Sequence, residues 1–339
     1  MFDDYLTPYK LERPVLTPSG IHGRFDEYLV DAPRLFRHNG RIYMMYIGFD
    51  GLGYQTALAT TEDMVHWREL GVILPKGDED RWDRIGRAGT CILADIGLYG
   101  SREMIRYDGK YWMFYHSYPS NGYEVGPAAQ GVAWTEDETL MHWTFCEYPI
   151  FTKQKEGAWD SGGLYGNWVV PKETGFEMFY NGKERQEWPW HEQVGRAFSH
   201  DLLHWERMGT EPVLKVSAQG WDAFFACGQH MLWDERKKRY VMFYCGYDGI
   251  HAQEGVAISH DGIHWEKRAE PIISNGVAGS LDETHAHKPG TICENGVLYH
   301  YYCAVRPTKT EEEKAMFGKE YRCITVARSV PWTDGVAMR

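Results

Sequence analysis

The sequence predicts an all-β protein, a five-bladed β-propeller whose four-stranded antiparallel blades surround an axial pocket. A tryptophan-ended phrase recurs along the chain, and an aromatic strand precedes each copy. No sustained apolar helical stripe interrupts this pattern. The copies of the phrase are Ala57–Trp67, Gly131–Trp143, Gly195–Trp205, Gly255–Trp265 and the degenerate Cys323–Trp332. A repeat of roughly 60 to 75 residues that is built from short strands is typical of a propeller blade.

The aromatic strand of each repeat is dense in residues that favour β structure. These strands are expected at Arg41–Tyr46, Lys110–Tyr115, Phe176–Tyr180, Arg239–Tyr244 and Val297–Tyr302. Tight turns precede four of them, for example Asn39-Gly40 and Asp108-Gly109, whose residue types supply the positive φ that hairpin turns need. A proline-aliphatic step follows the tryptophans, and an extra copy stands at Pro14–Leu16. We expect this N-terminal segment to feed the first blade and close the ring.

Composition limits the kind of protein this is. The repeat runs almost end to end, so residues 1–339 are expected to form a single domain. A net charge of −12 disfavours nucleic acid and anionic membranes as partners. The sequence shows neither a long apolar run nor a signal-peptide pattern. Seven cysteines without a C-x-x-C pair indicate buried thiols in a reducing compartment rather than disulfides or zinc, which predicts a cytoplasmic protein.

An aspartate recurs once per blade after an aromatic or apolar residue. These aspartates are Asp26, Asp83, Asp160, Asp222 and Asp282. Because every blade carries one, a structural role in turns between blades is favoured over catalysis.

The polar residues that differ between blades are better candidates for function. They lie where the innermost strands are expected to begin and to face the axis: Asp31 in the first blade, Arg102 and Glu103 in the second, Asn167 and Trp168 in the third, His230 in the fourth, and His287 and Lys288 in the fifth. Asp31 and Glu103 are the carboxylates among them. Because both carboxylates are expected to face one pocket, we expect them to act in catalysis.

The loops between the second and third strands should return to the same pocket face. In the third blade this loop, Asn181–Gln193, brings together Glu184, Arg185, Trp188 and Trp190. Tryptophans beside charged residues suit sugar rings, which stack on indole while their hydroxyls bind polar groups. The two tryptophans could instead pack against a neighbouring loop.

These residues resemble the five-bladed propeller glycosidases of families 43, 32 and 68, with the family 130 phosphorylases nearby. The segment Asp31–Phe36 with Asn39–Tyr43 is similar to their first-blade motif, and Ser101–Ile105 with Asp108–Trp112 to their second-blade motif. Ser259–Glu266 matches the phrase common to the group. One departure is that no carboxylate stands near Gly166–Trp168, where families 43 and 32 place their third-blade acid.

The resemblance implies an oligosaccharide substrate, most simply an arabinofuranosyl or fructofuranosyl one, cleaved by paired carboxylates. We expect Asp31 to act as base or nucleophile, Glu184 as acid, and Glu103 as a charge that tunes a neighbour. The expected substrate-binding residues are Arg102, Asn167, Trp168, Trp188, Trp190, His230, His287 and Lys288. His287 could also ligate an axial cation or act as an acid. No cofactor is required, although a structural axial cation such as calcium is compatible with the resemblance.

Two other functions remain open. A phosphorylase like those of family 130 would need a cationic cluster, for which Arg102, Arg185, Lys288 and Arg306 are available. A non-catalytic glycan-binding propeller would be consistent with the missing third-blade carboxylate.

Overall fold

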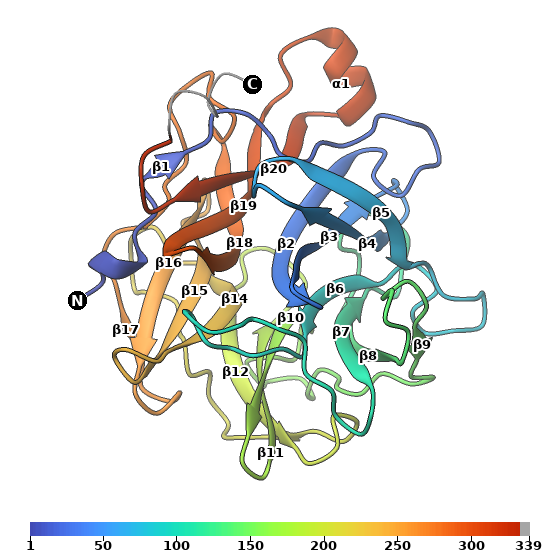
Figure 1. Ribbon diagram of the computed structural model, residues 1–339. Coiled ribbons are helices and arrows are strands. Elements are labelled where there is room, and N and C mark those ends of the chain that lie inside the picture. Colours follow the sequence, from blue (N-terminus) through green and yellow to red (C-terminus); the bar gives the residue numbers. More distant parts are fainter. Residues whose placement is uncertain (333–339) are drawn as a thin grey trace.

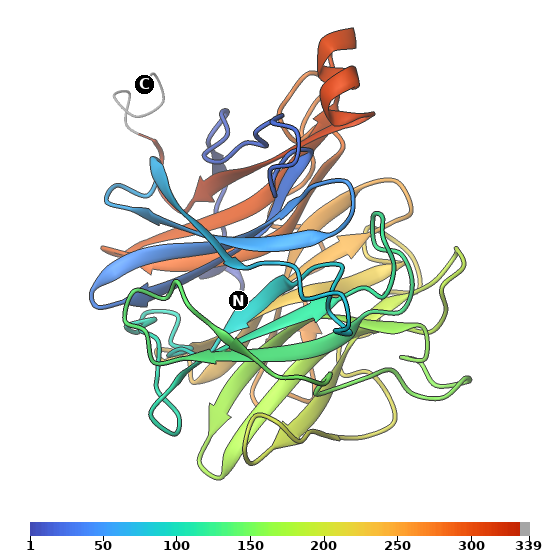
Figure 2. The ribbon, with the colours of Figure 1, turned by 90° about the vertical axis from the view of Figure 1, so that its right-hand side faces the viewer.

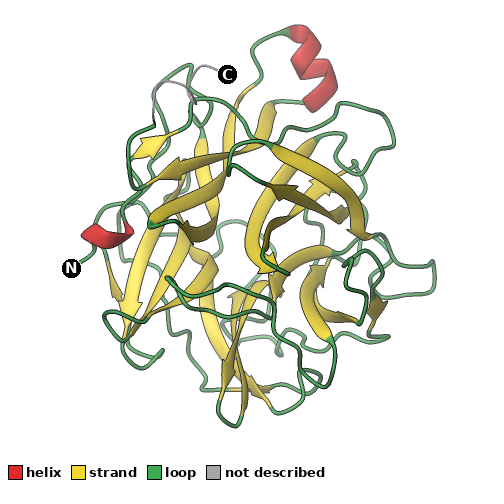
Figure 3. Ribbon diagram, viewed as in Figure 1, coloured by secondary structure: helices red, strands yellow, loops and turns green. Residues whose placement is uncertain are grey.

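A computed structural model describes residues 1–332 of the protein. Figure 3 shows that the molecule consists almost entirely of strands and connecting loops. The helical elements are the short 3-10 turn η1 (Asp3–Tyr5) and the helix α1 (Glu311–Phe317), which projects from the body of the molecule (Figures 1 and 2). In the described residues, neither is long and apolar enough to cross a membrane.

The strands form four-stranded antiparallel units, each built from consecutive strands except the last, which also takes in an N-terminal strand. The first unit is β2 (Leu29–His38), β3 (Arg41–Phe49), β4 (Tyr54–Thr61) and β5 (Trp67–Leu74). The second is β6 (Ala88–Ile92), β7 (Tyr111–Ser117), β8 (Ala129–Thr135) and β9 (Thr144–Phe145). The third is β10 (Gly163–Lys172), β11 (Gly175–Lys183), β12 (Glu192–Ser199) and β13 (Glu206–Arg207). The fourth is β14 (Phe225–Asp234), β15 (Arg239–Tyr247), β16 (Ala252–Ser259) and β17 (Glu266–Lys267). The fifth is β18 (His285–Glu294), β19 (Val297–Pro307) and β20 (Glu320–Arg328), to which the N-terminal β1 (Tyr9–Lys10) adds.

The units are arranged around a common centre (Figure 1). Their first strands β2, β6, β10, β14 and β18 contact one another in chain order, and β18 contacts β2. The third and fourth units also meet at a parallel pair between Glu192 and Phe225. This arrangement is that of a propeller, as the repeat predicted.

The N-terminal segment completes the last unit, not the first as the sequence suggested. β1 pairs with β20, and the backbone N–H of Val15 donates to the carbonyl of Ile324 at 2.8 Å. In the second, third and fourth units, the proline-aliphatic step after the tryptophan pairs in the same way with the third strand, as at Val194 and Leu214. In the last unit, Pro14–Leu16 therefore takes the place that the proline-aliphatic step takes in the second, third and fourth units.

In the second to fifth units, the recurring aspartates bind groups that hold the unit together. The hydroxyl of Tyr180, in the second strand of its unit, donates to Asp160 at 3.2 Å, and Arg207 from β13 donates to the same carboxylate at 2.8 Å. The tyrosine contact recurs at Asp83, Asp222 and Asp282. These contacts agree with the structural role predicted for this repeat position.

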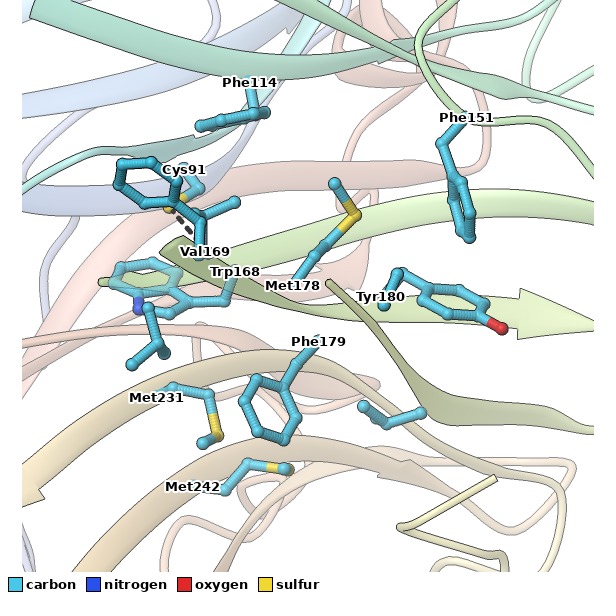
Figure 4. Close-up of a cluster of buried hydrophobic side chains, with 14 of the residues drawn as sticks. Cys91, Phe114, Phe151, Trp168, Val169, Met178, Phe179, Tyr180, Met231 and Met242 are labelled. Carbon is cyan, nitrogen blue, oxygen red and sulfur yellow. Dashed lines mark hydrogen bonds between the residues drawn. The ribbon is translucent and has the colours of Figure 1, made fainter. Parts of the chain in front are cut away.

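Neighbouring units pack against each other through apolar side chains. Figure 4 shows Phe179 of β11 against Met231 and Met242 of the fourth unit, in one buried cluster. On the other side of β10, the backbone N–H of Val169 donates to the thiol of Cys91 at 3.3 Å. Because the large rings lie between the units, the polar residues near the centre are held on a rigid frame.

Candidate functional site

A cavity of about 460 Å³ opens among the loops that join second to third strands. Its walls come from the first strands near their beginnings, and from the loops that carry Tyr118, Tyr123, Trp188 and Trp190. This confirms the prediction that these loops return to a shared face. A cavity of this volume, lined by aromatic rings and by charged and polar side chains, is of the kind that binds small molecules.

The inner strands bend at the cavity because each carries an irregularity at the same point. The pairing register shifts between Asp31 and Arg34 in β2, and between His287 and Gly290 in β18. Ala32 and Lys288 have φ values of 49° and 63°, so the chain is locally left-handed at these bulges. A bulge of this kind redirects side chains, and here it brings Lys288 into the cavity wall.

Asp31 lies fully buried beside the cavity and forms an ion pair with Lys288. Its other oxygen accepts a hydrogen bond from the backbone N–H of Ala32 at 2.7 Å. Burial alone would raise the pKa of Asp31, but Lys288, with His287 and Arg322, lowers it well below its usual range. The carboxylate is therefore ionised, and both of its oxygens already have partners.

Asp31, His287 and Cys303 offer ligand atoms that lie within 4.8 Å of one another. This set does not fit calcium, which prefers six to eight oxygen ligands, because Asp31 is its sole oxygen donor. The ammonium of Lys288 also supplies the positive charge that Asp31 needs. We therefore assign no metal to this cluster.

Two carboxylates that line the cavity were not among the predicted site residues. Glu192 begins β12 and accepts hydrogen bonds from the amide of Asn181 at 3.0 Å and from the indole N–H of Trp190 at 3.0 Å. Glu124 lies exposed in the loop between β7 and β8 and accepts one bond, from the hydroxyl of Tyr54, at 3.2 Å. The sequence signal for both was their place in, or directly after, a loop between second and third strands.

Aromatic rings cover two sides of the cavity. On one side Trp188 lies half-exposed against Trp190, with ring centroids 5.1 Å apart, and stacks on Phe224 at 5.0 Å. On the other side Tyr123 lies near Tyr54. The structure thus places Trp188 and Trp190 in the cavity wall, as expected for groups that contact a sugar ring.

Four predicted axial residues are buried next to the core and do not line the cavity. The Arg102 guanidinium donates to the carbonyls of Asp95 and Leu35, at 2.6 and 3.1 Å. His230 packs against Trp168 with ring centroids 4.2 Å apart. The amide of Asn167 donates to Gln130 at 2.6 Å. These residues hold the inner strands together, and none of them faces a space that a sugar could fill.

The predicted carboxylates Glu103 and Glu184 also lie outside the cavity lining. The inner strand of the second unit is β6, not the segment around Ser101, which instead pairs with Arg37 near the far end of β2. Glu103 there accepts a bond from the backbone N–H of Gly40 at 2.9 Å. Glu184 accepts bonds from the backbone N–H of His191, the shorter at 2.8 Å, within its own loop.

Comparison with known proteins supports a propeller glycosidase. No protein-family model and no curated protein matches the sequence. A solved structure described as a complex of BT0996 with RGII has a TM-score of 0.80 and 29% identity, covering 97% of this protein and 94% of that one. Another, described as "Glycoside hydrolase", has a TM-score of 0.80 and 28% identity, covering 98% and 94%. A thermostable family-43 glycoside hydrolase shares the fold with a TM-score of 0.61 at 16% identity, covering 94% of each protein.

These neighbours confirm the predicted resemblance to glycoside hydrolases of the propeller type. They indicate an enzyme of the glycosidase class and do not distinguish between its individual families.

Proposed function

We propose that the protein is a five-bladed propeller glycoside hydrolase that cleaves a short oligosaccharide in the cavity, with Glu192 and Glu124 as its paired carboxylates. The observation that carries this proposal is that these two carboxylates line one cavity with aromatic walls. Glycoside cleavage needs one carboxylic acid to protonate the leaving oxygen and one carboxylate to act as nucleophile or base. The ring of first strands and the four-stranded units support the count of five blades.

The surroundings of the two carboxylates favour different roles. Glu192 receives two N–H donors, which fix the direction of its carboxylate oxygens as a nucleophile or base requires. Glu124 receives one hydroxyl donor and lies on an exposed loop, and in this proposal it is the group that protonates the leaving oxygen. In this proposal Glu192 and Glu124 replace Asp31 and Glu184 as the reacting pair. Asp31 instead holds Lys288 in the cavity wall.

The proposed substrate is a furanoside, such as an arabinofuranosyl or fructofuranosyl oligosaccharide. The propeller neighbours support the glycoside class, and one neighbour's description refers to a complex with RGII. The cavity is bounded by loops and has a half-exposed tryptophan at its edge. Such a shape favours binding one end of a short oligosaccharide over binding the middle of a long one.

The four cations that the sequence offered for phosphate binding do not assemble into one cluster, so we propose hydrolysis and let the experiment below distinguish it from phosphorolysis. Of the four cations considered for it, Lys288 lines the cavity and is paired with Asp31. Arg102 is buried against backbone carbonyls, Arg185 is exposed, and Arg306 pairs with Glu313.

The test is to incubate the purified protein with arabinofuranosyl and fructofuranosyl oligosaccharides, with and without inorganic phosphate, and to identify the products. We expect free reducing sugar to form at the same rate with and without phosphate. Sugar 1-phosphate as the main product would establish phosphorolysis. Binding of these oligosaccharides without cleavage would indicate a glycan-binding propeller.

A further inference from the structure

Lys183 is a buried lysine in the cavity wall that has no acceptor within the protein. It is the last residue of β11, is 5% exposed and lines the cavity. Among residues 1–332, no carboxylate lies within ion-pair distance of its ammonium, and no oxygen accepts a hydrogen bond from it. An ammonium group has three donors, and because the Lys183 nitrogen is not among the enclosed atoms that lack a partner, its donors are open to the cavity.

The other cations of the cavity wall differ from Lys183 in this respect. Lys288 pairs with Asp31, and Arg322 donates to Glu320 at 2.8 Å. Arg34 donates to the carbonyls of Thr90 and Pro289. Each of these three has protein oxygens that use its donors, so Lys183 is the cation best placed to bind a ligand.

The position of Lys183 is fixed by its neighbours. Its nitrogen lies 4.4 Å from the ring centroid of Trp190 and 4.9 Å from that of Tyr165. It is the direct cross-strand partner of Glu192, so both side chains stand on the same face of the sheet. Burial lowers the pKa of Lys183, and Glu192, Glu124 and Glu184 oppose that shift.

We propose that the Lys183 ammonium donates to hydroxyl groups of a sugar bound beside Trp190 and Glu192, and so determines which glycosyl unit the cavity accepts. This rests on the proposed function, because the sugar is placed beside Glu192. The class of ligand is a neutral polyol. An anionic sugar fits less well at Lys183 itself, because Glu192, its direct cross-strand partner, would repel a negative charge placed there.

The consequence is a specificity that depends on hydroxyl position. A bond from a charged donor to a sugar hydroxyl changes affinity by about 10- to 100-fold. A substrate analogue that lacks the contacted hydroxyl should lose this factor with the wild-type protein. With a Lys183→Met variant, the analogue and the full substrate should bind with equal affinity, because the donor is already absent.

The experiment measures binding directly, by titrating the tryptophan fluorescence of the protein with L-arabinose, D-fructose and D-galacturonate. Variants Lys183→Met and Lys183→Gln are compared with wild type and with the control Lys153→Met, whose lysine is exposed and away from the cavity. Thermal unfolding of each variant confirms that it is folded. We expect at least one neutral sugar to bind the wild type and the control, and to bind both Lys183 variants about 10- to 100-fold more weakly.

Three results would overturn the inference. These are unchanged affinity in the folded Lys183 variants, Lys183-dependent binding of galacturonate alone, and no binding of any of these sugars to the wild type. Lys183-dependent binding of a neutral sugar without hydrolysis would refute the proposed catalysis and leave the inference standing. Hydrolysis with a kcat/KM that is unchanged in Lys183→Met would refute the inference and leave the proposed catalysis standing.

Discussion

Replacing Glu254 by glutamine should stabilise the protein at neutral pH and change its stability little in acid. Glu254 is fully buried in β16, opposite Cys245 of β15, and among the described residues neither carboxylate oxygen has a hydrogen-bond partner. Burial raises its pKa well above the ordinary value of 4.5. The nearby Cys245 and Asp31 add to this effect, and Arg34 opposes it.

The sign follows from proton uptake on folding. Above pH 4.5 the unfolded chain releases the Glu254 proton while the folded protein keeps it, so the free energy of unfolding falls as pH rises. The loss is about 1.4 kcal/mol for each unit by which the folded pKa exceeds the unfolded one. Glutamine has nearly the same shape and no proton to lose. We therefore expect a gain on the order of 1–3 kcal/mol at pH 7, vanishing near pH 4.

The assay is urea unfolding of wild type and Glu254→Gln across this pH range, with Glu312→Gln as control. Glu312 is exposed on α1, so its replacement should not change the pH dependence. If Glu254→Gln and the wild type lose stability with the same slope as pH rises, Glu254 is not a buried proton carrier and the reasoning is refuted.

Three further changes test the repeat and the cavity. The imidazole of His66, with the backbone N–H groups of His66 and Val65, overcomes burial and lowers the pKa of Asp63 to about 2. The stabilisation that the ionised Asp63 gives the folded protein should thus be present above pH 3.8 and lost as pH falls toward 2. Thermal unfolding at pH 7 should show that Asp63→Ala lowers the free energy of unfolding by about 1 kcal/mol. Asp160→Asn should cost about 1–3 kcal/mol, because Arg207 loses its charged partner, while kcat is retained; loss of kcat at unchanged stability would mean the aspartate is catalytic. Trp188→Ala should raise KM about tenfold with little change in stability, since half of this ring is already exposed; an unchanged KM would exclude it from the binding surface.

The fold could be predicted in detail because the repeats carry similar turn and strand residues at corresponding positions. The Asn-Gly and Asp-Gly turns have positive φ at both positions, such as 50° and 73° at Asn39 and Gly40. The inner strand of the second unit was misplaced because Ala88–Ile92 has five residues, whereas the first strands of the other units have ten. Ring closure was misassigned because Pro14–Leu16 precedes the first unit in sequence but pairs with the last in space.

The site was harder to predict because side-chain direction depends on bulges and loop paths. The inner strands were located well enough to place His287 and Lys288 in the cavity wall. A pattern of strands does not show that Arg102 and His230 turn into the core, or that Glu184 binds its own loop. Glu192 stands one residue from the predicted loop end, and its direction is set by its pairing with Lys183.

The most direct test of the account is the kcat/KM of Glu192→Gln and Glu124→Gln on an oligosaccharide that the wild type hydrolyses, beside Glu184→Gln and Glu103→Gln as matched controls. We expect each of the first two to lose about 10²- to 10⁴-fold in kcat/KM, with thermal unfolding unchanged. The two controls should stay within about tenfold of wild type, because their carboxylates lie outside the cavity lining. Full activity in Glu192→Gln, or a large loss confined to Glu184→Gln or Glu103→Gln, would contradict the account.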